Sequence, residues 1–328
     1  MTRSRRRGLI LVITASILFA INGTVSKAVL VAGVPALRLT ELRVTGTFVL
    51  LMVAIAVIRP HALRVTRAEL PTLLIYGIVG IALVQTLYFV AIRRLPVGIA
   101  LLIEYTAPIL VALWAQFAQH RRLPPRFWWA LAAAMAGLAM VAQVWRGATL
   151  NGVGVLAGFG AAVSLALYFI VGERTMRQGT RDVYSFTAWG FAVATLGVSL
   201  LQPWWTYPWS VLTRRSTVID ALPAVPVWLL VAWVVVLGTL VPYLLTLASL
   251  GHLTATASSV ASMLEPVLAG AVAWVVLSET LLPVQVVGAA VVLVAIVIAE
   301  LTGGHPMPTE ATVPTKVTGP TDATAPTE

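Results

Sequence analysis

The sequence predicts an all-α integral membrane protein in which ten transmembrane helices form two inverted five-helix repeats around a central cavity. Hydrophobic residues make up 59% of the 328 residues and charged residues only 10%, and the mean hydropathy is +0.93. A water-soluble domain of this length could not bury so much apolar surface, so lipid must surround most of the chain. Two further observations, the lengths of the apolar stretches and an internal repeat, give the number and arrangement of the helices.

Ten apolar stretches of about 20 residues are each long enough to cross the ~30 Å hydrocarbon core as a helix. Helices are expected because they satisfy their backbone hydrogen bonds internally, and the alternation typical of a barrel strand is missing. We place the helices at 8–31, 36–58, 70–92, 96–117, 125–145, 151–173, 183–203, 224–250, 253–277 and 281–301.

The two halves repeat at a fixed offset, 266 − 108 = 158 positions, with shared hydropathy and shared glycine and proline positions. In this alignment Gly80, Pro108 and Pro125 fall on Gly238, Pro266 and Pro283. The first repeat covers 8–145 and the second covers 151–301. Because five helices is an odd number, two halves threaded alike must be inserted in opposite senses, as in many carriers.

Arginines in the loops indicate the orientation. With the N-terminus inside, the cytoplasmic side receives 13 arginines and the outer side receives 6. Positive charge concentrates in cytoplasmic loops, so we expect both termini in the cytoplasm and the chain in the inner (plasma) membrane. The inner set is Arg3, Arg5, Arg6, Arg7, Arg59, Arg64, Arg67, Arg121, Arg122, Arg126, Arg174, Arg177 and Arg181, and the outer set is Arg38, Arg93, Arg94, Arg146, Arg214 and Arg215.

The two ends of the chain differ from its apolar body. Residues 1–7 form a basic cytoplasmic N-terminus, and the apolar run behind them resembles a signal peptide. That run continues to Val31 without a convincing small-residue cleavage site, so we expect the first helix to be retained. Residues 302–328 are rich in Thr, Pro, Ala and Gly, which cannot bury a core, and we expect a disordered cytoplasmic tail.

The composition argues against several classes of protein. The chain has no cysteine and four histidines without a metal-binding spacing, so we expect no metal site. A phosphate-binding loop and a GxSxG motif are missing, which argues against ATP-driven transport, against a cofactor and against an enzyme. The formal charge of +10 comes mainly from loop arginines, which points to membrane orientation rather than to nucleic acid.

Two glutamates, Glu104 and Glu265, lie in the middle of apolar segments. A charged side chain at the bilayer centre costs about 2.5–3.5 kcal/mol on insertion scales, so it should face protein or a water-filled cavity. At the repeat offset Glu104 matches Ser262 and Glu265 matches Ala107, and residues three apart share a helix face. Both carboxylates therefore face the same relative surface of their half. The alternative is a structural role, in which two protonated glutamic acids hydrogen-bond neighbouring helices together.

Uncharged polar side chains recur at helical spacing in four further segments. Each of them suits the orientation of a small polar ligand, and interhelical hydrogen bonding explains each about as well. Taken jointly, they predict a pore lined by several helices. The predicted cavity residues are Glu104, Glu265, Asn22, Gln85, Tyr88, Tyr168, Tyr243 and Ser262.

Two prolines and three charged residues complete the predicted site. Pro108 and Pro266 each remove one backbone donor, which can hinge a helix. Arg38 and Glu41 are three residues apart at the outer end of the second helix and can form an ion pair, while Arg43 points elsewhere. These three residues either snorkel around a local ion pair or form an outer gate or a contact for an anionic substrate.

The most specific sequence motifs are LEPVLAGAVAWVVLSETL in the second half and RLPVGIALLIEYTAPILVAL in the first. With these motifs, residues 8–301 resemble the drug/metabolite transporter superfamily in its EamA-type, ten-helix form. The segment from Glu104 to Pro108 is most similar to the threonine/homoserine exporter-like branch. The resemblance implies a basket of helices 1, 3, 4, 6, 8 and 9 around the cavity. The chain departs from the pattern where Arg121 stands opposite Glu279, so we assign Glu279 no paired gating role.

These features predict a secondary transporter of small polar metabolites that works by alternating access. The resemblance implies export of amino acids or their derivatives, by analogy of fold. Glu104 and Glu265 would contact an ammonium group or carry a coupling proton. Efflux of drug-like, aromatic or cationic compounds and uptake of metabolites remain alternatives, and a membrane scaffold or an intramembrane enzyme is a weaker one. The expected partners are a small-molecule substrate and the lipid bilayer; the pattern does not encode an oligomeric state.

Overall fold

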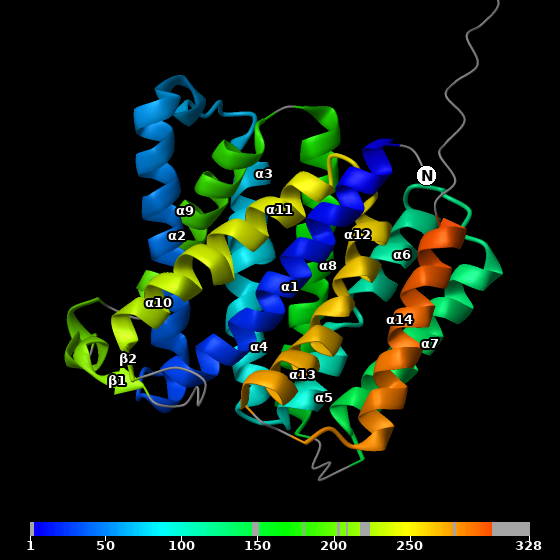
Figure 1. Ribbon diagram of the computed structural model, residues 1–328. Coiled ribbons are helices and arrows are strands. Elements are labelled where there is room, and N and C mark those ends of the chain that lie inside the picture. The colour runs from blue at the N-terminus through cyan, green and yellow to red at the C-terminus, as the bar shows by residue number, and fades with distance from the viewer. Residues whose placement is uncertain are drawn as a thin grey trace, which may run out of the picture.

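The computed structural model describes residues 3–145, 151–179, 181–201, 204–207, 209–216, 224–277 and 280–303. Within these residues, ten helices are long and apolar enough to cross a membrane, which confirms the predicted fold class. The helices pack in one bundle, in which some run side by side and others cross obliquely (Figure 1). Glu279 and most of the predicted tail lie outside the described residues.

The helices of the first half include two that are not continuous α-helices. The third membrane helix contains a π-helical stretch, and the fourth is interrupted after Glu104. In chain order the elements are α1 (Arg3–Val31), α2 (Ala36–Ile58), η1 (Pro60–Leu63), α3 (Leu70–Leu74), η2 (Ile75–Leu83), α4 (Val84–Ile92), α5 (Val97–Glu104), α6 (Ala107–Phe117) and α7 (Pro125–Ala142).

The second half has the same irregularities in its third and fourth helices. A π-helical stretch lies in its third helix, and its fourth is interrupted at Met263. The elements are α8 (Gly152–Gln178), α9 (Val183–Leu201), η3 (Trp204–Thr206), η4 (Trp209–Thr213), β1 (Arg215–Ser216), β2 (Val225–Pro226), α10 (Val227–Val235), η5 (Val236–Leu240), α11 (Val241–Ser249), α12 (Ala255–Ser262), α13 (Leu264–Leu277) and α14 (Pro283–Gly303).

Several helix ends differ from the predicted ones; α1, for example, begins at Arg3 rather than 8. Three of the differences have a clear local reason. α7 ends at Ala142 rather than 145, because Gln143 adopts a left-handed conformation with φ 49°. α8 continues to Gln178 rather than ending at 173. It ends there because the next residue, Gly179, adopts a left-handed conformation. α10 begins at Val227 rather than 224, because the preceding β2 pairs with β1 in an antiparallel ladder.

The two halves exchange their first helices, because each of these helices packs mainly against the other half. α1 packs against α11, α12 and α13 of the second half, whereas α8 packs against α4, α5 and α6 of the first. α7 and α14 pack together along one edge of the bundle, and α2 and α9 pack together along the opposite edge (Figure 1). The four helices at the edges leave the centre to α1, α8 and the irregular helices of both halves.

Two glycines show how closely this exchange repeats. A Cβ on Gly8 would lie 2.6 Å from Cγ of Leu253, and a Cβ on Gly154 would lie 2.8 Å from Cγ of Leu95. Leu95 and Leu253 are equivalent at the repeat offset, since 253 − 95 = 158. The two glycines are 154 − 8 = 146 positions apart, so they do not follow this offset, but each lies near the start of the first helix of its half. The opposite insertion of the two halves stays a prediction.

Both ends of the described chain lie at the same end of the bundle. The N-terminal end of α1 and the C-terminal end of α14 lie close together (Figure 1), and Nη2 of Arg5 is 3.0 Å from Oε2 of Glu300. An even number of membrane crossings requires this arrangement. The side of the membrane on which the two ends lie stays a prediction.

Candidate functional site

A cavity of about 220 Å³ lies at the centre of the bundle. Its walls come from α1, η2, α4, α5, α8, α11, α12 and α13, which belong to the six helices expected to form a basket, and from α2 through Arg43. The structure brings all eight of the predicted cavity residues together in this wall. They are Asn22, Gln85, Tyr88, Glu104, Tyr168, Tyr243, Ser262 and Glu265.

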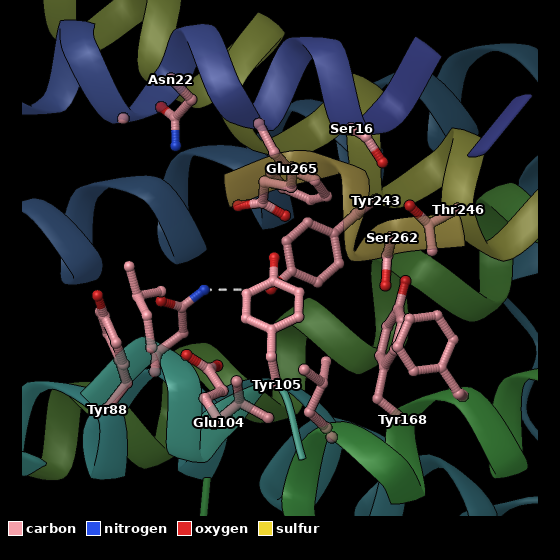
Figure 2. Close-up of a pocket in the computed structure, with 18 of the residues that line it drawn as sticks. Ser16, Asn22, Tyr88, Glu104, Tyr105, Tyr168, Tyr243, Thr246, Ser262 and Glu265 are labelled. Carbon is pink, nitrogen blue, oxygen red and sulfur yellow. Dashed lines mark hydrogen bonds between the residues drawn. The ribbon is translucent and has the colours of Figure 1, made fainter. Parts of the chain in front are cut away.

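The two glutamates reach into the cavity from opposite sides (Figure 2). Both are partly buried. In the described part of the chain, Glu104 has no hydrogen-bond or ion-pair partner, and the hydroxyl of Tyr105 is directed toward Glu265. Carboxylates left with free hydrogen-bonding capacity beside open space can accept hydrogen bonds from water or from a ligand. The contact of Tyr105 with Glu265 joins two helices, as in the structural alternative, whereas Glu104 makes no such contact with the described residues.

The helix interruptions place these carboxylates. Because proline has no N–H, Pro108 leaves the carbonyl of Glu104 without its helical donor, and Pro266 does the same for Ser262. The chain responds with tight turns at these points: the amide of Thr106 donates to the carbonyl of Ile103 at 3.1 Å, and the amide of Met263 donates to that of Val260 at 3.1 Å. Glu104 and Ser262 are repeat mates, so both breaks open toward the cavity at equivalent depths.

Arg43 lies in the cavity wall, apart from Arg38 and Glu41, with which the sequence analysis groups it. It stands seven residues inside α2, about 10 Å from the helix end, and its Nε donates to Oγ1 of Thr239 at 2.9 Å. Salt bridges to Arg43 are absent from the described residues. The sequence showed that Arg43 points away from Arg38, but its depth alone was compatible with a snorkelling side chain.

Aromatic and amide side chains form the remaining wall. Nε2 of Gln85 donates to the hydroxyl of Tyr243 at 3.1 Å, so these two repeat mates meet across the halves (Figure 2). The ring of Tyr243 makes an edge contact with Tyr168, with centroids 5.7 Å apart. Asn22 accepts a hydrogen bond from Ser26 through Oδ1 and points its amide nitrogen into the cavity (Figure 2). The wall therefore offers donors and acceptors at several fixed positions.

The predicted ion pair at the end of α2 is present, away from the cavity. Nη1 of Arg38 is 2.7 Å from Oε2 of Glu41, which is fully buried. Arg38 also bonds Thr206 and lies over the ring of Tyr207, 5.8 Å from its centroid. Burial and the nearby Glu41 raise the pKa of Tyr207 to about 12. The role of Arg38 and Glu41 as a gate stays a prediction.

Sequence reasoning missed a second charged cluster, at the end of the bundle where the termini lie. Glu173 is buried, at 4% exposure; Arg177 donates to Oε1 at 2.9 Å, and the amide of Ala255 donates to Oε2 at 3.0 Å. Arg121 of the first half lies 3.3 Å from the same carboxylate. The i, i+4 spacing of Glu173 and Arg177 was the available signal. The long-range partners could come only from the tertiary structure.

The described residues include no group of three or more His, Cys, Asp and Glu side chains that could hold a metal ion. What the cavity offers instead is one guanidinium, two carboxylates and several neutral hydrogen-bonding groups. This arrangement can bind a small polar molecule that carries both charges.

Known proteins with similar sequences were found across the whole membrane region. The EamA-like transporter family matches residues 6–143 and 152–301. Threonine/homoserine exporter RhtA of Escherichia coli (strain K12) is 29% identical over 275 residues, which are 82% of each chain. The exporter of the same name from Salmonella typhimurium (strain SL1344) is also 29% identical over 275 residues, 82% of each chain.

A solved structure described only as "Crystal structure of protein" has the same fold. It superposes with a TM-score of 0.72 at 19% identity, covering 90% of this chain and 96% of that chain. Together with the ten membrane helices and the exporter relatives, these matches support a multi-pass protein of the inner membrane. The chain belongs to the EamA-like transporter family and is a membrane transporter.

Proposed function

We propose that this transporter exports small amino acids or their derivatives by alternating access. The observation that carries the proposal is the central cavity, in which Arg43 lies together with Glu104 and Glu265. Two relatives at 29% identity are named threonine/homoserine exporters, which supports the same class of substrate here.

The charges in the cavity fit an amino-acid zwitterion. The planar fork of the Arg43 guanidinium matches the two oxygens of an α-carboxylate. A carboxylate of Glu104 or Glu265 accepts hydrogen bonds from the α-ammonium group. Because one ammonium group needs only one counter-charge, the second glutamate is available to carry a coupling proton.

The size of the cavity favours such a substrate over a drug-like compound. Its volume of about 220 Å³ is below the ~300–1,000 Å³ of pockets that take drug-sized ligands. A purely cationic compound would meet the guanidinium of Arg43, which opposes its binding. Uptake uses the same binding site as export, and the imposed gradients decide between them.

The interruptions at Tyr105 and Met263 provide a route for alternating access. Each divides a helix that lines the cavity into two rigid pieces, α5 and α6 in one half and α12 and α13 in the other. Rotation at these breaks can open one side of the cavity while the other closes, with Glu104 and Glu265 staying near the centre. Such motion of broken helices about a midplane site is common in carriers.

Glutamine substitution at both glutamates tests the proposal. We expect Glu104→Gln with Glu265→Gln to abolish transport of radiolabelled threonine and homoserine in vesicles with an imposed proton gradient. A hydrogen bond to a charged group contributes about 1.5–3 kcal/mol, so the single variant that contacts the ammonium group should raise KM about tenfold or more. Replacement of the glutamate that carries the coupling proton should instead remove the dependence of transport on the proton gradient.

Glu300→Gln is the matched control, because Glu300 is also a carboxylate in a membrane helix but does not line the cavity. This variant should transport at close to the wild-type rate. Membrane insertion of all variants is measured by the amount of purified monodisperse protein. Wild-type transport by the double glutamine variant would contradict the proposal.

A further inference from the structure

A second pocket, of about 370 Å³, lies outside the central cavity, where the start of α3 meets the end of α8 and the start of α9. We call it the interfacial pocket. Glu69 directly precedes the third membrane helix, and Arg181 lies between the sixth and the seventh. The pocket is therefore at the level where helices leave the membrane, at the end that the arginine count predicts to be cytoplasmic. It is lined by Ala68, Glu69, Thr72, Leu73, Ile75, Val171, Arg174, Thr175, Gln178, Arg181 and Phe186.

Arg181 brings an incompletely bonded charge to this pocket. Its side chain is 7% exposed, and its Nη2 donates to the carbonyl oxygen of Ala62 at 3.1 Å and also to that of Arg64. Its Nη1 has no hydrogen-bond partner among the described residues. A buried donor without a partner is costly, and each case calls for a specific explanation.

Glu69 does not satisfy that donor. Its Oε2 is 3.6 Å from Nη1 of Arg181, beyond hydrogen-bond length. The same oxygen already accepts from the amide of Thr66 at 2.8 Å and from its hydroxyl at 2.9 Å. These hydrogen bonds, led by that from the amide, lower the pKa of Glu69, so the carboxylate is ionised at neutral pH.

Arg174 adds a second cation to the rim. It is exposed, and the described residues include no salt bridge to it. Two guanidinium groups and one carboxylate give the interfacial pocket a net charge of +1. That charge matches a phosphodiester, which carries a single negative charge, and arginine is well suited to bind phosphate oxygens.

One wall of the pocket continues onto a lipid-facing surface. Ile75 lines the pocket and is 46% exposed, and Leu70, Leu74 and Ile78 on the same side of the helix are 48%, 39% and 43% exposed. Val171 and Phe186 make part of the floor apolar. A free anion would use only the polar rim, whereas a lipid would also cover this apolar stripe.

We propose that the interfacial pocket binds the headgroup of an anionic phospholipid, with the phosphate held by Arg174 and Arg181 and an acyl chain along α3 and η2. Basic pockets between membrane helices on the cytoplasmic side are suited to anionic headgroups. The proposal does not depend on the substrate of the central cavity.

Native mass spectrometry of the full chain tests the proposal with phosphatidylglycerol and phosphatidylcholine of equal acyl chains. We expect wild type to retain phosphatidylglycerol preferentially and Arg174→Gln to retain about tenfold less, the effect of one lost charge-assisted hydrogen bond. Arg174 is exposed, so this substitution should leave the fold intact, which circular dichroism checks. Arg122→Gln removes an exposed arginine outside the pocket and should behave as wild type.

Two outcomes would overturn the proposal. The first is equal retention of phosphatidylglycerol by Arg174→Gln and Arg122→Gln. The second is a rise in melting temperature with inorganic phosphate that equals the rise with phosphatidylglycerol, because the site would then take a free anion and not a lipid. A preference for phosphatidylglycerol that Arg174→Gln removes and phosphate does not reproduce supports it.

Discussion

At the scale of single residues, the charges inside the bundle differ in how they are compensated. Arg38 and Glu41 neutralise each other directly at 2.7 Å, and Glu41 is fully enclosed. Glu104, Glu265 and Arg43 instead face the cavity. A buried charge that has lost its partner is strongly destabilising, whereas a charge in a solvated cavity keeps part of its hydration. The two groups should therefore respond differently to substitution.

Glu41→Gln should lower the stability of the protein, because it removes the charge of the fully buried carboxylate that lies 2.7 Å from Nη1 of Arg38. Breaking such a pair costs about 3–5 kcal/mol, measured as a fall in melting temperature in detergent. Arg38→Gln combined with Glu41→Gln should recover part of the loss. Arg122→Gln, at an exposed position, should change stability by about 0.5 kcal/mol or less. A Glu41→Gln variant as stable as wild type would refute this account of the pair.

The eight predicted residues that line the cavity were recognisable in the sequence, because a polar side chain in the middle of an apolar helix must face protein or water. Their role in binding stays a prediction. Arg43 was harder to place. An arginine near a helix end can snorkel toward the interface, and only the rotation of α2 against η5, which brings Arg43 to Thr239, directs it inward. The partners of Glu173 could not be predicted for a related reason, since Arg121 and Ala255 are distant from it in sequence.

At the scale of elements, the irregular helices of the two halves correspond. The π-helical stretch η2 spans Ile75–Leu83, and η5 spans Val236–Leu240, which lies within the range equivalent to η2 at an offset of 158. The helix breaks at Tyr105 and Met263 are also equivalent. Hydropathy predicted these four helices as continuous spans, because the apolar pattern does not record a change in hydrogen-bond register. The prolines marked the region of each break but not its residue.

Gly238 is a position in η5 at which an added side chain would collide with a residue of the cavity wall. A Cβ there would lie 2.1 Å from Oδ1 of Asn22, so Gly238→Ala must displace the cavity-lining Asn22. We expect transport to fall at least several-fold while the ten-helix fold persists. Gly80→Ala, the repeat mate, should have a smaller effect, because its Cβ would lie 3.3 Å from Cα and Cβ of Tyr168.

Gly270→Ala is the control for this prediction, because a Cβ at that position meets nothing within 4 Å. Exchange of radiolabelled threonine by the three alanine variants is compared at equal amounts of protein. Equal exchange rates for Gly238→Ala and Gly270→Ala would show that the approach of η5 to Asn22 does not matter for transport.

At the scale of the whole molecule, matched contacts relate the two halves, and ten spans bring both ends of the chain together. The number of helices could be predicted from the lengths of the apolar stretches alone. The exchange of α1 and α8 between the halves could not, because it depends on long-range packing. The direction of insertion rests on the count of loop arginines.

The absence of cysteine from the chain makes the orientation testable. We expect Arg94→Cys to react with a membrane-impermeant maleimide in intact cells, and Arg122→Cys to react only after the membrane is permeabilised. Both positions are exposed, so access from one side of the membrane decides the outcome. Labelling in the reverse pattern would contradict cytoplasmic termini.

Binding of an amino acid in the central cavity is the central claim, and protection of a single cysteine tests it most directly. Ser262→Cys places a thiol in the cavity wall, and Arg122→Cys places one outside it. At a threonine concentration about ten times Kd, a small thiol reagent should react about tenfold more slowly at Ser262→Cys and at an unchanged rate at Arg122→Cys. An unchanged rate at Ser262→Cys, in a variant that still transports threonine, would contradict the claim.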